Sequence, residues 1–592
     1  MTSKATRVTA GLFDRPLKQD EMLPEFKAVR TDPGSFAERP RVRELLERCE
    51  RAFDPLDELP RLTYSLYQRY DRTGSRREYD RAQRRKRTSA ASAALLAIFR
   101  EDRRWIDLLH DLVWSICEET CWVPPEHMGN HPIDLFSAET AFMLAEIDHL
   151  LADRLDEAVR QRIRDEVERR ILGPYLEKEF GWFDGHNNWT GVCESSVGAA
   201  FLYLESDPRR LARAMNRALK GLHKFLDRAF LGDGGSSEGV GYWQYGLINT
   251  VDFAELLRER TNGAADFLAH DKFKKIALYP HAVKTGLASF YSVSDCVGSA
   301  SFAPGLIARL AERTGVDELL AFLNKHTTAL GPGRLPHAIR SVLWWDGTVR
   351  RSPRIDDRML PETGVARIVA PRRRIVVMAK AGDNQENHNH NDVGSFAVYV
   401  RGEPMICDPG AGLYDKKYFG PERYDNPLCN SYGHSVPRVS GRLQPFGRAY
   451  RGRIETFDVT PGTKTIGIEF SDAYDLKSLT ELSRRIVLQA RGPDAGRITL
   501  EDRFVFKGRT LPIEEAFTTW HPVSIRKSGV AVIRGGGHEL RLRVLDPEGA
   551  RFEVEDLSVL VKGRPEPSVL RRLTCPLTKG ARGFTLQILV VQ

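Results

Sequence analysis

The spacing of apolar residues changes once along this chain, and the change restricts the folds that the chain can adopt. Up to about residue 340, apolar residues recur with the period of an amphipathic helix. From about Trp344 they alternate with polar residues in β-branched runs, as in strands of an antiparallel sheet. Helices first and strands afterwards indicate separate layers or domains and not a βαβ sheet.

Two regions show the change in detail. A helix is predicted over 155–171, where every fourth residue is apolar, and Gly173-Pro174 is expected to end it. Strands are predicted over 374–382, 395–400 and 405–408, with a turn at 401–404.

These patterns predict a multidomain α+β protein in three parts. Residues 1–90 form a helical and irregular lead-in, 91–345 a helical domain, and 346–592 an antiparallel β-sandwich. Paired helices of this kind close into a toroid or stack as a solenoid, and no clean sequence repeat decides between the two.

The composition excludes several classes of protein. The 592 residues include 88 Lys and Arg against 80 Asp and Glu, and 41% are hydrophobic, which excludes a disordered tail, a collagen-like repeat and a disulfide miniprotein. The net charge of +8 suits nucleic acid or an acidic polysaccharide. The densest basic run, 72–87, is a solvated helix face or a polyanion-binding surface.

The cysteines and the first 30 residues indicate the cellular compartment of the protein. The eight cysteines include no CxxC pair, which favours reduced thiols in a cytosolic protein. The first 30 residues lack the apolar stretch of a signal peptide, and no run approaches 18 apolar residues. We therefore expect a cytoplasmic protein that does not bind a membrane.

The segment 183–196 is the first of three that are rich in chemically active side chains. Asn187 and Asn188 precede Trp189. The two amides either cap a turn or helix entry or donate hydrogen bonds to a ligand carboxylate or hydroxyl.

The second segment, 233–246, is rich in glycine and aromatic residues. Such residues form a platform for a sugar or simply a packed loop. Tyr242 or Tyr245 could transfer protons if neighbouring positive charge or hydrogen-bond donors lowered the phenol pKa from its usual value near 10.

The third segment, 384–392, lies between two predicted strands. On an extended chain His388 and His390 point to the same face. Asp408 and His434 could complete a metal site with either or both of them, although an HxH pair also occurs by chance.

Five stretches together carry a family resemblance, which spans about residues 110–440: HNNW, EGVGYWQYG, HNHNDVGSF, GEPMICDPGAGLY and SYGHSV. The chain resembles the heparinase II/III-like polysaccharide lyases, a superfamily that includes oligoalginate lyases. The resemblance implies an incomplete (α/α) toroid followed by an antiparallel β-sandwich, with a cleft that cleaves uronic-acid glycans by β-elimination.

The resemblance also implies roles for individual residues. Tyr242 looks like the catalytic tyrosine, with Tyr245 as its competitor, and His388 looks like a second acid or base. Asn188, or Asn187, would neutralise the uronate carboxylate. One structural Zn²⁺ per chain would be held by a set of three: His390, Asp408 and His434. The expected substrate-binding residues are Asn187, His186, Tyr245, Glu238, Trp189 and Tyr424. Several subfamilies have histidine after the asparagine, where this chain has Trp189, so His186 is a candidate for that role.

The function expected from this resemblance is that of a lyase, which leaves a C4–C5 unsaturated uronate. A phenolate could take the C5 proton and then, as the phenol, return one to the leaving oxygen. The expected partner is an acidic oligosaccharide, from a glycosaminoglycan or alginate, and not nucleic acid; a homodimer is left open. The alternatives are a glycoside hydrolase, with carboxylates drawn from Glu194, Glu238 and Glu386, or a non-catalytic acidic-glycan-binding protein.

Overall fold

The computed structural model describes residues 8–18, 21–53, 59–100, 102–527 and 529–591. By their internal contacts these residues form two compact units. The helical unit consists of those within 1–230, 243–277 and 301–352, and the sheet unit of those within 231–242, 278–300 and 353–592. Each unit therefore combines three stretches of chain, whereas the sequence predicts uninterrupted parts with a boundary at 345/346.

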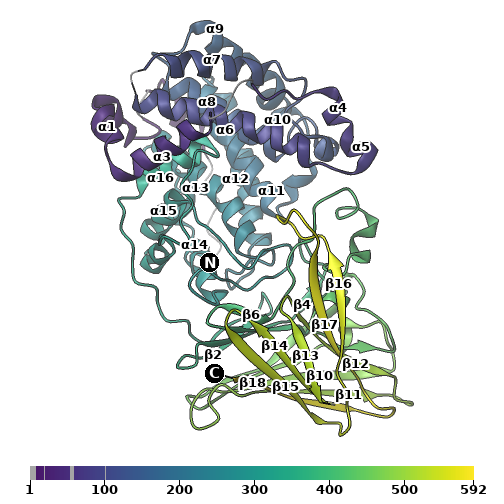
Figure 1. The fold of residues 1–592 in the computed structure, drawn as a ribbon. Helices are drawn as coiled ribbons and strands as arrows, with labels where there is room; N and C mark the ends of the chain where they lie inside the picture. The colour runs from purple at the N-terminus through teal and green to yellow at the C-terminus, as the bar shows by residue number, and fades with distance from the viewer. Residues whose placement is uncertain (1–7, 19–20, 54–58, 101, 528, 592) are drawn as a thin grey trace. The chain divides into compact units, whose positions relative to one another are not determined.

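The α-helices follow one another along the first part of the chain (Figure 1). Their bounds are α1 Phe26–Thr31, α2 Pro33–Ala37, α3 Pro40–Arg51, α4 Tyr64–Tyr67, α5 Arg69–Thr73, α6 Arg77–Phe99, α7 Arg104–Cys117, α8 Leu135–Leu150, α9 Glu157–Val167, α10 Gly173–Glu177, α11 Asn188–Leu204, α12 Pro208–Arg228, α13 Val240–Arg260, α14 Lys272–Ala282, α15 Pro304–Thr314 and α16 Leu335–Trp344. Within the described residues, no helix has the length and apolar composition needed to cross a membrane.

Helix α11 lies in the core of the helical unit. It is buried along almost its whole length and packs against α8 and α12. Gly191 permits this close packing, because a Cβ there would lie 2.7 Å from the ring of Phe225. The closure of these helices into a toroid stays a prediction.

The predicted helix end at Gly173-Pro174 is wrong. A π-helical turn, Glu168–Leu172, follows α9 directly, and α10 begins at Gly173. Pro174 lies in the first turn of α10, where a missing N–H removes no hydrogen bond within that helix.

The strands form three antiparallel sheets (Figure 1). The five-stranded sheet has the order β1-β2-β3-β5-β6, the nine-stranded sheet β13-β14-β15-β18-β11-β10-β9-β8-β4, and the four-stranded sheet β16-β17-β12-β7. Their bounds are β1 Arg358–Leu360, β2 Val365–Ala370, β3 Ile375–Lys380, β4 Gly382–Asn384, β5 Phe396–Val400, β6 Glu403–Ile406, β7 Arg438–Val439, β8 Gly447–Val459, β9 Thr463–Glu469, β10 Leu479–Gln489, β11 Ile498–Phe506, β12 Ile513–Thr519, β13 Val523–Lys527, β14 Val530–Gly535, β15 His538–Asp546, β16 Glu553–Val559, β17 Ser568–Pro576 and β18 Gly583–Val591.

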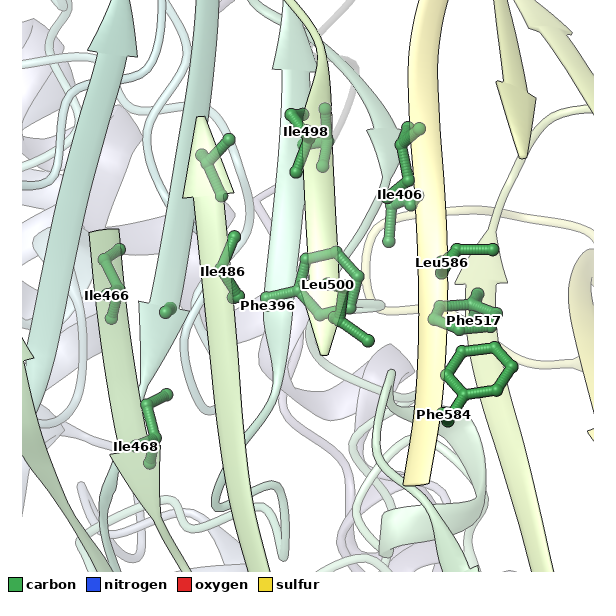
Figure 2. Packing of buried hydrophobic residues seen from close by; sticks show 14 of the residues in the cluster. Phe396, Ile406, Ile466, Ile468, Ile486, Ile498, Leu500, Phe517, Phe584 and Leu586 are labelled. Atoms are coloured by element: carbon green, nitrogen blue, oxygen red, sulfur yellow. The ribbon is translucent and has the colours of Figure 1, made fainter. Parts of the chain in front are cut away.

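One apolar core joins these sheets. Figure 2 shows Phe396 of β5 near residues of β10 and β11, including Ile486 and Leu500, and the same buried cluster includes Phe517 of β12. The predicted helical part followed by antiparallel sheet is confirmed.

The turn between β5 and β6 is shorter than the sequence predicts. Val400 pairs with Glu403, so only Arg401 and Gly402 form the turn, and both have positive φ, 54° and 90°. Pro404, predicted in the turn, lies in β6, an edge strand that tolerates a residue without an N–H.

A buried ion pair fixes loops to the nine-stranded sheet. Arg484 of β10 donates to Asp502 of β11 at 2.9 and 2.6 Å. Its Nη1 atom donates to the carbonyl oxygens of Gly394 and Ser435, at 2.8 and 2.7 Å. The two loops that contain His390 and His434 are thereby held to one guanidinium.

We predict that Arg484→Ala lowers the free energy of unfolding by about 3–5 kcal/mol, because it leaves the buried Asp502 charge without its partner. Arg485→Ala is the matched control, since Arg485 is exposed and pairs with Glu501 at the surface; its effect should stay within about 0.5 kcal/mol. Urea denaturation measures both, and equal losses would contradict the account.

Candidate active site and metal centre

The glycine-rich segment 231–242 is part of the sheet unit because Asp233 binds it there. Asp233 accepts hydrogen bonds from the backbone N–H groups of Glu362 and Thr363 at 2.9 Å each, and from Thr363 Oγ1 at 2.7 Å. Gly235 is required at this contact, because a Cβ would lie 1.8 Å from Thr363 Oγ1. The segment ends at Tyr242, in the first turn of α13.

Asp295 lies at the centre of the site and is only 1% exposed. Five side chains from other loops direct hydrogen bonds to its carboxylate: His388 Nδ1 at 2.8 Å, His390 Nε2 at 3.0 Å, Tyr414 at 3.1 Å, Arg423 at 3.0 Å, and Tyr418. No sequence motif marks Asp295.

The surroundings of Asp295 keep it ionised. Burial alone would raise its pKa, but the hydrogen bonds from His388 and His390 outweigh burial and hold the pKa well below its ordinary value. An ionised carboxylate fixes the N–H on Nδ1 of His388 and on Nε2 of His390. The other ring nitrogen of each neutral imidazole is then an acceptor.

His388 stacks on Tyr242. Their ring centroids are 4.2 Å apart and the planes differ by 17°. His388 Nε2 lies 3.9 Å from Glu238 Oε2, beyond hydrogen-bond distance. The backbone of His388 has a φ of 53°, a left-handed conformation that is uncommon for histidine and that its bond to Asp295 helps to hold.

Tyr242 remains a phenol in this setting. Its hydroxyl bonds to that of Tyr414, and Lys562 Nζ donates to it at 3.3 Å. Burial and the charge of Asp295 raise the pKa of Tyr242 well above its ordinary value, although the bond with Tyr414 opposes the shift. Tyr242 is therefore suited to donate a proton.

His390, Asp408 and His434 form a group that could hold a metal ion. Their ligand atoms all lie within 4.8 Å of one another. His390 donates through Nε2 to Asp295, and His434 Nε2 lies 3.2 Å from the carbonyl oxygen of Leu428. This arrangement leaves both Nδ1 atoms with lone pairs, as metal ligation requires.

Three buried polar atoms of this group support the metal assignment. His390 Nδ1, His434 Nδ1 and Asp408 Oδ2 form no hydrogen bond with the described residues. His434 Nδ1 and Asp408 Oδ2 nevertheless lie 3.2 Å apart. A cation between them would satisfy all three atoms.

A second group, Asp295, His390 and Cys429, is less suited to a metal. Arg423 already places a positive charge 3.0 Å from Asp295. Burial raises the pKa of the Cys429 thiol to about 12, so the thiolate ligand is not formed at neutral pH.

Tyr424 is the remaining predicted residue of the sheet unit. Tyr424 accepts a hydrogen bond from Asn389 Nδ2 at 3.3 Å, and its ring stacks on Phe446, which is 49% exposed. Phe419, 48% exposed, meets the rings of His388 and Tyr414 edge-on. These aromatic rings are available to contact a sugar.

The other predicted residues belong to the helical unit. Asn187 caps α11, accepting from the N–H of Trp189 at 3.0 Å, and this is one of the two roles predicted for it. Asn188 is 4% exposed, and its Oδ1 has no hydrogen bond with the described residues. Trp189 packs on His127 with centroids 4.7 Å apart. His186 immediately precedes the cap residue Asn187.

Tyr245 has different neighbours from Tyr242. Its hydroxyl lies 3.4 Å from Glu139 Oε2 and accepts from Arg334 at 3.4 Å. Burial and Glu139 raise its pKa far above the ordinary value.

Sequence reasoning missed Asp295, Tyr414, Tyr418, Arg423 and Lys562. Only Tyr414 lay within a recognised stretch, GEPMICDPGAGLY. The others come from segments without a motif and meet at the site only in the folded chain.

A family model matches part of the chain. Residues 352–576 match the model of the family described as heparinase II/III-like, C-terminal. The comparison with curated proteins found no match.

Solved structures share the fold over almost the whole chain. A heparinase III is 12% identical, with a TM-score of 0.62 over 99% of this chain and 94% of its own. A heparan sulfate lyase from Pedobacter heparinus is 11% identical (TM-score 0.55; 99% and 93%). A variant of chondroitin AC lyase from Streptomyces coelicolor A3 is 12% identical (TM-score 0.54; 97% and 83%).

We predict that the purified protein binds about one metal ion per chain, and that His390→Ala abolishes stoichiometric binding and lowers the melting temperature, because metal binding is coupled to folding. His538→Ala, a half-buried histidine of β15, is the control. Elemental analysis and thermal melting measure both effects. Metal-free protein whose melting temperature is unchanged by a chelator would refute the assignment.

Proposed function

Since residues 352–576 match the heparinase II/III-like C-terminal family model, we propose that the chain is a polysaccharide lyase that cleaves a uronic-acid-containing glycan by β-elimination. The reaction removes the proton on C5, expels the O4 oxygen and leaves a C4–C5 double bond. The observation that carries the proposal is the stacked pair of Tyr242 and His388, held on Asp295.

The reaction places three demands on the protein. The C5 proton is weakly acidic while the adjacent carboxylate is ionised, so a donor must stabilise the charge that develops there; such a donor is worth about 3–4 kcal/mol. A base must take the proton, and an acid must protonate the leaving oxygen.

His388 is the proposed base. Its Nδ1–H donates to the ionised Asp295, so Nε2 holds the lone pair that accepts the C5 proton. As the imidazole becomes positive, the carboxylate of Asp295 stabilises it, in the manner of an Asp–His pair in hydrolases.

Tyr242 is the proposed acid. Its raised pKa favours the phenol, which can protonate the leaving oxygen. The roles of base and acid, which the sequence analysis gave to one tyrosine, are thereby divided between His388 and Tyr242. Lys562, 3.3 Å from the hydroxyl, stabilises the phenolate that remains after transfer.

Asn188 is the proposed partner of the substrate carboxylate. A neutral amide can donate to a carboxylate without a charge of its own. Its buried side-chain oxygen has no hydrogen bond with the described residues, so the protein does not fully engage the amide; the group that would bind the carboxylate is the amide N–H, not this oxygen.

Zinc is the proposed metal. Two imidazole nitrogens and a carboxylate oxygen are ligands that zinc accepts in tetrahedral sites. A zinc ion at His390, Asp408 and His434 would join three loops of the sheet unit. It would thereby fix the loop that contains His388, two residues before His390.

A glycoside hydrolase is supported less well. It needs two carboxyl groups on either side of the scissile bond. Glu194 is fully buried and bonded to Tyr175, and Glu386 pairs with the buried Lys380 at 3.2 Å. Only Glu238 lies near His388.

We predict that the protein produces a conjugated, ultraviolet-absorbing product from an acidic oligosaccharide, and that Tyr242→Phe and His388→Gln each lower kcat by roughly 10²–10⁴-fold. Candidate substrates are oligomers of heparan sulfate, chondroitin, hyaluronan and alginate. Tyr450→Phe, which removes a phenol of β8, is the control.

A substrate with a nitrophenoxy group at C4 separates the two roles, because this group leaves without a proton. Tyr242→Phe should regain turnover on it, and His388→Gln should not. Recovery of both variants, or of neither, would contradict the division of roles. If neither the wild-type protein nor any variant turns over a substrate, the result would favour a non-catalytic binding protein.

We further predict that Asn188→Ala lowers kcat more than it raises KM, because the contact strengthens as charge develops in the transition state. Asn188→Asp should be worse, since a like charge would face the substrate carboxylate. A methyl-esterified substrate is neutral at that group, so Asn188→Asp should lower kcat less on this substrate than on the free acid. If Asn188→Asp keeps a kcat near that of the wild type on the free-acid substrate, Asn188 does not bind the substrate carboxylate. That role would then pass to Asn187 or His186.

A further inference from the structure

The helical unit contains a cavity of about 640 Å³ that takes no part in the proposed proton transfers. Residues of α3, α6, α8, α13 and α16, Ala303 and residues of the loop 329–334 line it, and all of them belong to the helical unit. Its volume lies within the range of small-molecule sites, about 300–1,000 Å³.

Arginine is the prevailing charged residue of the cavity wall. Three of the four arginines there have carboxylate partners, namely Arg48 with Glu44 at 2.7 Å, Arg87 with Glu119 at 2.6 Å and Arg334 with Glu139 at 2.9 Å. The fourth, Arg84, lies over the ring of Phe136, 4.6 Å from its centroid. It forms no ion pair or hydrogen bond with the described residues.

The neighbouring charges leave the cavity positive. Glu119 is shared between Arg87 and Lys86, whose Nζ lies 3.1 Å away, so one carboxylate faces two cations. Glu139 pairs with Arg334, and the charge of Arg84 also acts on it. His337 contributes no charge, because burial and the nearby Arg334 hold its pKa well below its ordinary value. The guanidinium of Arg84 is therefore only partly compensated, because it shares the carboxylate of Glu139 with Arg334.

A second polar group in the wall also lacks a partner. Gln83 is 1% exposed, and its Nε2 donates to the carbonyl oxygen of Trp122 at 2.8 Å. Its Oε1 is buried and accepts no hydrogen bond from the described residues. A ligand hydroxyl could donate to this oxygen.

The rest of the wall suits the body of a sugar ring. Phe136 and Tyr245 supply aromatic surface, and Met143, Ile248 and Leu330 supply aliphatic surface. Sugars combine hydroxyl groups with apolar C–H faces, and an acidic sugar adds an anion that can pair with Arg84.

We infer that this cavity binds an acidic sugar unit, with its carboxylate or sulfate at Arg84 and a hydroxyl group at Gln83 Oε1. The inference rests on the proposed function only for the class of glycan, and it does not depend on the bond-breaking step. It also gives a role to part of the basic run 72–87, for which the sequence left a solvated face and a polyanion-binding surface as alternatives.

The test is calorimetric titration of the full chain with a heparan sulfate tetrasaccharide and with its unsulfated heparosan counterpart. All proteins carry Tyr242→Phe to prevent turnover. Adding Arg84→Gln should weaken binding roughly tenfold or more, because it removes a charge-assisted hydrogen bond. Arg84→Lys should be intermediate, since it keeps the charge but not the planar fork.

Arg81→Gln is the matched control, an exposed arginine of the same helix that does not line the cavity, and it should bind as the parent does. If Arg84→Gln lowers the affinity for the sulfated ligand only, Arg84 binds a sulfate group. If it lowers the affinity for both ligands equally, Arg84 binds the carboxylate. Equal affinity of the Arg84→Gln and Arg81→Gln proteins for both ligands would overturn the inference.

The failures of the two proposals are distinguishable. A wild-type protein that makes no unsaturated product but loses affinity through Arg84→Gln refutes the lyase and supports the cavity. An active enzyme whose affinity does not change with Arg84→Gln refutes only the cavity.

Discussion

The buried negative charge of Asp295 is the interaction on which the site in the sheet unit depends. One of its oxygens binds His388 and the other binds His390, so a single carboxylate sets the tautomers of the proposed base and of a proposed metal ligand. The charge survives burial because several donors converge on it. The proposed metal binding and the proposed proton transfer would therefore be coupled through Asp295, even though different groups perform them.

The order of structural classes along the chain could be predicted because apolar spacing reports burial directly. The predicted strand at 395–400 becomes β5, whose core positions include Phe396 and Val398. Details that depend on tertiary context were less predictable. Pro174 resembles a helix end, but a proline is equally compatible with a helix start, and spacing alone does not separate the two. The sequence did not predict that 231–242 and 278–300 belong to the sheet unit, because the residues they pack against are distant in sequence.

The candidate site was predictable where residues cluster in the sequence. His390, Asp408 and His434 lie in short, unusual stretches, and the structure groups them as expected. Asp295 and Lys562 stand alone in sequence, and their importance arises only from what surrounds them after folding. The same holds for the state of Tyr242: the expected lyase reaction suggested a phenolate as the base, whereas burial and Asp295 favour the phenol.

The central claim is that the chain is a lyase. It rests on how the proposed base, His388, and the proposed acid, Tyr242, are arranged around Asp295. Mass spectrometry of both products from one defined uronate tetrasaccharide tests it most directly. β-Elimination only redistributes the atoms of the substrate, so the account predicts that the masses of the two products sum to the mass of the substrate. Products whose masses sum to that of the substrate plus one water would show hydrolysis and contradict the account.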